Sequence, residues 1–170
     1  MTLKTKPKIK AKTGLQAGRG GKRRLPEGPL RGLDILKGIQ KRNRAYSPFV
    51  ELLAMRVLAV EPGAVSISAR PDRCHLNING AVHGGYLVSL LDTAMGCACL
   101  SLLEAGEEYT TLELKTSFLR PLLQKQNVRA EATVAKRGSR IVFAEAKVVA
   151  GNGDLIAHAS CTCLVSRPKG

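Results

Sequence analysis

The sequence predicts an α+β domain in which one long apolar helix is enclosed by a curved antiparallel sheet. The first observation is the run 83–103, which is apolar nearly all round and lacks the alternation of a strand. The second is a set of alternating segments, two before that run and four after it. The third is the shortness of the connections, which suits antiparallel hairpins.

Two short helices are expected before the first strand. The segment 33–45 is amphipathic, and it is followed by SPFVELLA, in which Ser47 suits an N-cap and Pro48 the first helical position. The segment 55–71 then alternates between apolar and polar residues on both sides of a turn at 61–63, which predicts a pair of strands.

Four further strands are predicted at 109–119, 127–137, 140–150 and 154–165. Their alternation predicts which side chains face the helix. The inward residues expected in the first, second and fourth of these strands are Leu112, Leu114 and Phe118; Val128, Ala130, Ala132 and Val134; and Leu155, Ala157, Ala159, Cys161 and Cys163.

The positive charge is concentrated at the N-terminal end. The chain of 170 residues has a formal net charge of +14, and 14 of its 27 lysines and arginines precede residue 46, with two of its 13 acidic residues. We therefore expect residues 1–31 to be a basic disordered tail and residues 32–170 to be one folded domain. The tail is either simply solvated or makes weak, salt-sensitive contacts with polyanions.

Composition limits the partners and the compartment. With three Phe, three Tyr and no Trp, the folded part offers no aromatic-lined basic face, so we expect no specific nucleic-acid partner. The apolar run contains Asp92 and lacks basic flanks, so no membrane span is expected. Five cysteines without a CxxC pair predict reduced thiols in a cytoplasmic protein and no metal site.

Asp92 is the one charged residue in the apolar run from 86 to 103. A carboxylate there either meets a cation across an interface, marks a helix kink, or has a functional role. Gly84 and Gly85, at the expected helix start, favour the functional role because they expose backbone N–H groups at the positive end of the helix dipole. Gly85 and Asp92 share one face of the helix, about 10 Å apart, so they could bracket one reacting carbonyl carbon and one water.

Four stretches give the sequence a family resemblance: LNINGAVHGGYLVSLLDTAMGCA, YTTLELKTSFLRPL, RAEATVAKRGSRIVFAEAKV and GDLIAHASCTCLV. Over residues 45–166 the chain resembles the hotdog-fold acyl-CoA thioesterases of the phenylacetate-degradation (PaaI-like) type. The matched positions are Asn77, Gly80, His83-Gly84-Gly85, Asp92 and Phe118-Leu119-Arg120-Pro121. The resemblance implies a long helix wrapped by a sheet, a homodimer or homotetramer built by edge-to-edge sheet pairing, and active sites at the dimer interface.

The resemblance also implies roles for individual residues. The Gly84 N–H, assisted by the Asn77 side chain, would polarise the thioester carbonyl. Asp92 of the partner subunit would be the general base for water or the nucleophile that forms an anhydride. Thr111 matches a position that holds the water. His83 would cap the helix and orient Asn77, or else transfer protons.

The expected activity is hydrolysis of acyl-CoA thioesters to a free acid and coenzyme A; the alternative is a noncatalytic acyl-CoA-binding hotdog protein. Coenzyme A belongs to the substrate, so no separate cofactor is expected. The basic turn Arg137, Gly138, Ser139 and Arg140 either holds the coenzyme A phosphates or is a solvated hairpin. Arg120 either contacts phosphate or forms an interface ion pair. Tyr86, Leu90 and Met95 are candidates for the acyl pocket, and His75 and His158 are expected to be structural or on the surface.

Overall fold

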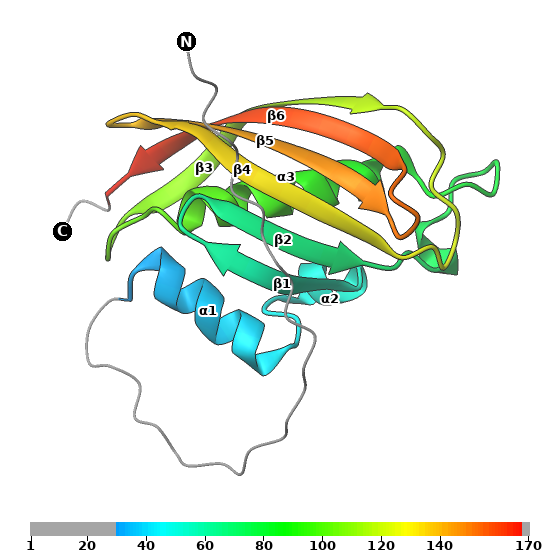
Figure 1. Ribbon diagram of the computed structural model, residues 1–170, viewed down its shortest axis with the longest axis horizontal. Helices are drawn as coiled ribbons and strands as arrows, with labels where there is room; N and C mark the ends of the chain where they lie inside the picture. The colour runs from blue at the N-terminus through cyan, green and yellow to red at the C-terminus, as the bar shows by residue number, and fades with distance from the viewer. Residues whose placement is uncertain (1–29, 168–170) are drawn as a thin grey trace.

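One antiparallel sheet of six strands curves around a single long helix, α3 (Gly84–Leu100), in the computed structural model (Figure 1). The strands are β1 (Met55–Glu61), β2 (Ala64–Ala69), β3 (Glu108–Phe118), β4 (Val128–Arg137), β5 (Ile141–Ala150) and β6 (Leu155–Ser166). Their order is β1-β2-β4-β5-β6-β3, so β1 and β3 form the two edges. The predicted α+β class and its hotdog arrangement are confirmed.

The structure describes residues 30–167, so the predicted tail lies almost wholly outside the described residues. The first described helix, α1 (Gly32–Arg42), packs against β1 (Figure 1). Its first residue is also tied to the end of α3, because the Gly32 N–H donates to the Leu103 carbonyl over 3.1 Å. A side chain on Gly32 would collide with the backbone of Leu100, so the close approach of the two helices requires glycine.

The second helix, α2 (Pro48–Leu52), forms as the sequence predicts. The Ser47 hydroxyl accepts a hydrogen bond from the Val50 N–H over 3.3 Å, and Pro48 occupies the first helical position. The chain then enters β1, and β1 and β2 are joined by a turn at which Gly63 has φ +73°. Glycine is suited to this turn because the left-handed region strains other residues.

Helix α3 is buried on most of its surface, as its apolar composition predicts. Ten of its residues are buried: Tyr86, Leu87, Leu90, Leu91, Ala94, Met95, Gly96, Cys97, Ala98 and Cys99. Its small second half lets the sheet come close, because a Cβ on Gly96 would lie 2.9 Å from Cζ of Tyr109 on β3. The uncovered stripe of the helix carries the partly exposed side chains of Val88, Ser89, Asp92 and Thr93.

Three residues predicted to face the core are exposed, and two of them, Leu112 and Leu155, lie at irregularities of the sheet. Leu112 is 57% exposed, because the register between β3 and β6 shifts between Thr111 and Glu113. Such a bulge adds one residue and reverses the alternation. Leu155 is 38% exposed and lies beside a second shift between β5 and β6. The remaining inward residues predicted for β4 and β6 face the core; in β3, Leu114 is partly buried and Phe118 is exposed.

The cysteines are all free thiols, and four of them are buried: Cys97, Cys99, Cys161 and Cys163. Cys74 is the exception, since it is exposed. Within residues 30–167, no three His, Cys, Asp or Glu side chains are grouped so that they could hold a metal ion. None of the helices in that range is both long and apolar enough to cross a membrane.

Candidate active site

The loop that leads into α3 is held in shape by its own backbone. The Asn77 N–H donates to the Ala81 carbonyl over 2.8 Å, and the Gly80 N–H donates to the Asn77 carbonyl over 3.0 Å. Gly80 has φ +78°, a conformation that favours glycine. The His83 N–H then donates to the His75 carbonyl over 2.8 Å, which fixes where the helix begins.

His83 caps α3, and its cap leaves one backbone amide free. The His83 Nδ1 accepts from the Gly85 N–H over 2.8 Å, and the His83 carbonyl accepts from the Tyr86 N–H over 2.9 Å. Within the described part of the chain, the Gly84 N–H has no hydrogen-bond acceptor. This amide lies at the positive end of the helix dipole, so it is suited to bind a carbonyl oxygen that gains negative charge.

The Asn77 side chain presents its amino group to the same region. Its Oδ1 accepts from the N–H groups of Asn79 and Ala81, over 2.9 and 3.2 Å. The oxygen is thereby committed to the loop, and the Nδ2 hydrogens remain as donors. Asn77 and Gly84 line one pocket of about 380 Å³, so the structure brings together the two carbonyl-polarising groups that the sequence predicts.

Aromatic and cationic side chains close the other side of this pocket, which we call the Asn77 pocket. It is also lined by Phe118 and Arg120, at the end of β3. A Cβ on Gly84 would lie 3.2 Å from Cζ of Phe118, so the ring lies directly against the helix start. The Arg120 side chain is 61% exposed, and its Nε lies 4.0 Å from Oδ1 of Asp154. Such a long, exposed ion pair leaves the guanidinium largely available.

Asp92 accepts a hydrogen bond from Thr111, a contact that the predicted role of Thr111, holding the water, did not include. The Thr111 Oγ1 donates to Asp92 Oδ1 over 3.0 Å, which joins the edge strand β3 to the middle of α3. Both residues are partly buried. Because Asp92 lies on the uncovered stripe of the helix, one side of its carboxylate faces solvent rather than the apolar core.

The neighbours of Asp92 remain protonated at neutral pH. Burial raises the pKa of the Cys97 thiol to about 11, and the Asp92 charge raises it further against the lowering effect of its bond to Tyr46. Burial is also the main cause of the raised pKa of Tyr109, to which Cys97 and Asp92 contribute. Neither residue therefore supplies a competing anion, and Asp92 is the carboxylate available for chemistry on this stripe.

The two halves of the predicted site lie far apart within one chain. Gly84 and Asp92 are separated by eight residues of α3, which is about 12 Å along the helix axis. A carbonyl oxygen on the Gly84 N–H lies about 3 Å from it, and an attacking water lies about 3 Å from the carbonyl carbon. Because the N–H groups of a helix point toward its N-terminus, that oxygen lies beyond the helix start, on the side away from Asp92, so one chain does not bring both groups to one thioester.

The basic turn between β4 and β5 lies at the other end of α3. Arg137 donates to the carbonyls of Gly138 and Ser139 and forms an ion pair with Glu107 over 3.4 Å. It lines a surface depression together with Leu102, just beyond the C-terminal end of α3. Ser139 and Arg140 are exposed. Within one chain, the predicted coenzyme A contacts are therefore not brought near Gly84.

The two other histidines have the roles expected of them. His75 is 9% exposed; its Nδ1 accepts from the Asp72 N–H over 2.8 Å, and its Nε2 lies 2.8 Å from the Leu52 carbonyl. The two bonds require the tautomer with the proton on Nε2, so His75 joins the loop to α2. His158 is exposed on β6.

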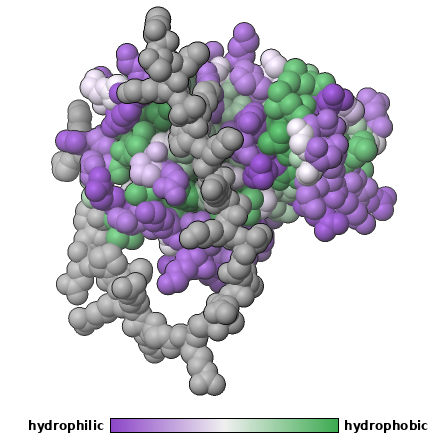
Figure 2. All heavy atoms as spheres, in the orientation of Figure 1, coloured by the Kyte–Doolittle hydropathy of each residue, from purple (hydrophilic) through white to green (hydrophobic). Residues whose placement is uncertain are grey.

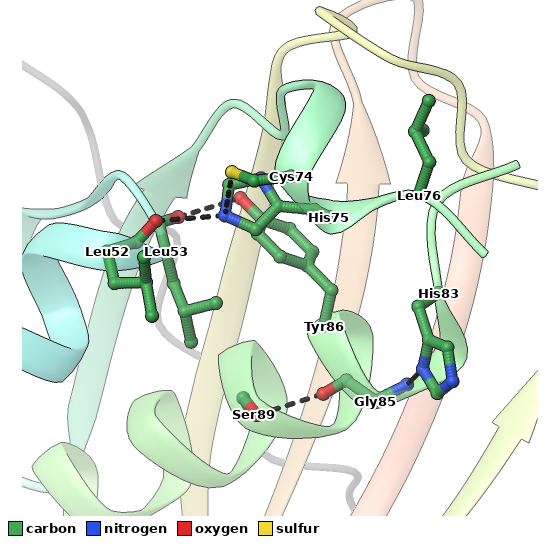
Figure 3. Close-up of a pocket in the computed structure, with 9 residues that line it drawn as sticks. All are labelled: Leu52, Leu53, Cys74, His75, Leu76, His83, Gly85, Tyr86 and Ser89. Carbon is green, nitrogen blue, oxygen red and sulfur yellow. Dashed lines mark hydrogen bonds between the residues drawn. The ribbon is translucent and has the colours of Figure 1, made fainter. Parts of the chain in front are cut away.

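A second pocket lies beside the start of α3, and no sequence motif predicted it. It has a volume of about 310 Å³ and is lined by the nine residues drawn in Figure 3. Its apolar wall comes from Leu52 and Leu53 at the end of α2 and from Leu76. The rings of Tyr86 and His75 are in tilted contact, with centroids 4.7 Å apart. We call it the Tyr86 pocket.

Only one of the three expected acyl-pocket residues lines the Tyr86 pocket. Tyr86 does, whereas Leu90 and Met95 are fully buried beneath the sheet. The three look alike in sequence because all are apolar residues of an apolar helix. The wall formed by Leu52 and Leu53 has no motif, since its place depends on how α2 packs against β1 and α3.

Comparison with known proteins shows what the chain is similar to. The thioesterase superfamily model matches residues 79–157. A predicted esterase of Saccharolobus solfataricus is 26% identical over 136 residues, which are 80% of this chain and 96% of that protein. A variant of the phenylacetic acid degradation protein PaaI from Thermus thermophilus is 29% identical, with a TM-score of 0.65 over 69% of this chain and 98% of that one.

A third likeness concerns the fold alone. A hypothetical thioesterase from Streptococcus pneumoniae, solved with coenzyme A, is 21% identical, with a TM-score of 0.63 over 68% of this chain and 91% of that one. The matched region of the family model contains the helix start, Asp92 and the strands β3 to β5. The chain therefore has the hotdog fold of the PaaI-like thioesterases, and its residues 79–157 are similar to the thioesterase superfamily.

Proposed function

We propose that this protein hydrolyses acyl-CoA thioesters, releasing a free acid and coenzyme A. The observation that carries the proposal is the unbonded Gly84 N–H beside the Asn77 amino group, in one pocket at the start of α3. Two donors that line one pocket suit the oxygen of a thioester under attack, which gains negative charge in the transition state. Coenzyme A bound to the pneumococcal protein of the same fold supports the choice of thioester.

The proposed hydrolysis can follow one of two routes, which share the same groups. The thioester oxygen accepts hydrogen bonds from the Gly84 N–H and the Asn77 Nδ2, which makes the carbonyl carbon electrophilic. Asp92 takes a proton from a water that attacks this carbon, or attacks the carbon itself and leaves an anhydride for water to open. In both routes the C–S bond breaks, the coenzyme A thiolate leaves and takes up a proton, and Thr111 holds the carboxylate in position through its 3.0 Å hydrogen bond.

The 12 Å separation within one chain leads to a site shared by two subunits, with Gly84 and Asn77 from one and Asp92 and Thr111 from the other. The edge strand β3 supports this proposal. Among residues 30–167 no other strand pairs with its outer edge, and it carries the exposed side chains of Leu112 and Phe118. Figure 2 shows hydrophobic side chains gathered at the upper right, near the end of β3 in Figure 1. An edge of this kind is suited to pairing with a second copy.

The test combines a panel of acyl-CoA substrates with a variant that lacks the backbone N–H of residue 84. Release of coenzyme A from acyl-CoA thioesters is followed with a thiol reagent for wild type, Gly84→Pro and Gly84→Ala. Proline lacks the N–H and is tolerated at the first position of a helix. His83, with φ −61° and ψ 137°, already has the conformation preferred before proline.

We expect Gly84→Pro to lower kcat/KM by roughly 10²–10³-fold, the cost of losing one such donor. Gly84→Ala is the matched control, because it adds the same Cβ beside Phe118 and keeps the N–H. It should remain within a few-fold of wild type. Equal activity in the two variants would remove Gly84 from the mechanism, and no coenzyme A release from any acyl-CoA by folded wild type would overturn the function.

A further inference from the structure

We propose that the Tyr86 pocket receives the acyl group and selects an uncharged hydrocarbon chain or ring of about six to ten carbons. This inference rests on the proposed function, because it names the substrate class of the same site. It follows from three properties of the pocket: its place beside the carbonyl-polarising groups, the bonding of its polar atoms, and its volume.

The two pockets at the start of α3 meet at adjacent residues. Gly84 lines the Asn77 pocket, whereas His83 and Gly85 line the Tyr86 pocket. A thioester whose oxygen is held at the Gly84 N–H extends in two directions from that point. The Asn77 pocket combines Asn77 and the exposed Arg120 with apolar side chains, so it suits the coenzyme A arm, which carries amides and phosphates along a hydrocarbon backbone. The Tyr86 pocket has a leucine wall and no lysine or arginine, so it suits the acyl arm.

The polar atoms of the inner wall are already bonded to protein (Figure 3). The Tyr86 hydroxyl donates to the Leu53 carbonyl over 2.9 Å, and both His75 nitrogens are engaged as described above. The Ser89 hydroxyl donates to the Gly85 carbonyl over 2.9 Å. A carboxylate or hydroxyl at the end of an acyl chain would therefore lose its water without gaining a strong partner.

Cys74 and His83 are the exceptions among the pocket's described polar groups. The His83 Nδ1 accepts from Gly85, so its Nε2 carries the proton, but His83 is adjacent to Gly84 and therefore lies beside the thioester and not at the end of the acyl chain. Cys74 is a weak exception. Its thiol lies 3.5 Å from His75 Nε2, whose proton is directed to the Leu52 carbonyl. A thiol is a poor donor and a poor acceptor, so it does not compensate a charged acyl end. The pocket is thus built to exclude charge and not to recognise it.

The volume sets the length of the acyl group. A cavity of about 150 Å³ is enough to bind benzene in a protein interior, which is roughly 25 Å³ per carbon. The Tyr86 pocket is about 310 Å³, so it has room for about twelve heavy atoms when completely filled. A single chain or ring does not fill every part of an open pocket, so we expect about six to ten carbons in the acyl group.

The first experiment measures kcat/KM on saturated acyl-CoA thioesters from two to sixteen carbons and on a dicarboxylic acyl-CoA of eight carbons. It compares wild type, Leu52→Trp and Leu123→Trp. Leu52 is 63% exposed at the mouth of the Tyr86 pocket, and Leu123 is 60% exposed and lines neither pocket, so the two changes are matched in size and exposure. Wild type should prefer six to ten carbons and reject the dicarboxylic thioester by at least 100-fold.

We expect Leu52→Trp to lower kcat/KM for the ten-carbon substrate at least tenfold relative to the four-carbon one, and Leu123→Trp to leave the profile unchanged. An unchanged profile in a folded Leu52→Trp variant would overturn the assignment of the pocket. Turnover of acyl-CoA without a chain-length optimum, or with equal use of the dicarboxylic thioester, would overturn the substrate class and leave the proposed function standing.

The second experiment needs no catalysis. Cys74 is exposed while the other four cysteines are buried, so N-ethylmaleimide should label it first. S-octyl-CoA, a thioether that cannot be hydrolysed, should slow this labelling at least fivefold because its chain fills the pocket, and S-ethyl-CoA should not. Labelling at the same rate with saturating S-octyl-CoA would show that the chain lies elsewhere.

Discussion

Thr111 donates a hydrogen bond of 3.0 Å to Asp92, and it can do so because β3 bulges at the next residue. Counting back by twos from Leu114, which faces α3, would place Thr111 on the outer face of the sheet. The register shift between Thr111 and Glu113 inserts one residue and turns Thr111 toward the helix. An irregularity of the edge strand thus supports the candidate catalytic carboxylate.

The first prediction concerns this hydrogen bond. Thr111→Val keeps the shape and the β-branch but removes the donor, so Asp92 loses its anchor on β3. We expect kcat to fall by about tenfold, the effect of about 1.4 kcal/mol, with KM nearly unchanged. Thr111→Ser restores the hydroxyl and should recover most of kcat. A serine variant as slow as the valine variant would show that the methyl group, rather than the hydrogen bond, matters.

The second prediction separates a catalytic Asp92 from a structural one. Asp92→Asn keeps the shape and removes the charge, so kcat should fall by roughly 10²–10⁴-fold, the range for losing a positioned acid–base group. The melting temperature should stay level or rise, because no cation within the described residues pairs with Asp92. Full activity in a folded variant, or a loss of activity only in step with a lower melting temperature, would make Asp92 structural.

The third prediction is a dependence of stability on pH. The pKa of Glu107 lies below its usual 4.5, chiefly because the Glu104 N–H donates to it, and Arg137 and Arg167 add to the effect. A carboxyl whose pKa is lowered by folding stabilises the protein above its unfolded pKa, and this stability is lost as the pH falls through the folded pKa. Glu107→Gln should therefore lower the melting temperature by a few degrees at pH 7.

The difference between wild type and Glu107→Gln should close as the pH is lowered below about 4.5. Thermal unfolding of both proteins from pH 7 to pH 3 provides the measurement. A constant difference across this range would show that Glu107 acts through packing and not through its charge.

Much of this fold could be predicted because its strongest signals are local. The cap at Ser47, the glycines at the start of α3 and the alternation of β4 each follow from a few adjacent residues. The bulge in β3 could not be predicted, since Leu112 places an apolar residue where the alternation expects one and thereby hides the shift. The Tyr86 pocket was likewise hidden, because its wall joins Leu53 and Leu76 through tertiary packing alone.

The fourth prediction distinguishes the two arginines of the β4–β5 turn. Arg140 is exposed, whereas Arg137 is committed to Glu107 and to the turn. If the turn holds coenzyme A phosphates, Arg140→Gln should raise KM for acyl-CoA roughly three- to tenfold and leave kcat within twofold, because a distant phosphate contact binds the ground state and the transition state alike. A pantetheine thioester, which lacks the nucleotide, should show no change.

Arg137→Gln is the comparison for this experiment. It should lower the melting temperature, because Glu107 loses an ion pair that is only partly exposed. Equal rises of KM for acyl-CoA and for the pantetheine thioester in Arg140→Gln would show that the turn does not contact the nucleotide, and the predicted phosphate role would fail.

The last prediction tests whether two chains share one site. Gly84→Pro removes a donor that polarises the carbonyl, and Asp92→Asn removes the carboxylate. Each variant alone should therefore be nearly inactive. In a mixed dimer built on a two-fold axis, one site receives both defects and the other receives none. Mixed dimers, co-expressed with two different tags and purified through both, should therefore recover about half of the wild-type kcat.

A pair of defects in the same half provides the control. In a mixed dimer of Gly84→Pro with Asn77→Ala, each site retains one damaged donor, so no site is intact and no activity should return. The 12 Å between Gly84 and Asp92 makes the recovery with Asp92→Asn the expected result, since the groups of one chain cannot reach the same carbonyl. If the Gly84→Pro and Asp92→Asn dimer is as inactive as its parents while it remains folded, each site lies within one chain, and α3 must then present both groups in an arrangement other than the helix described above.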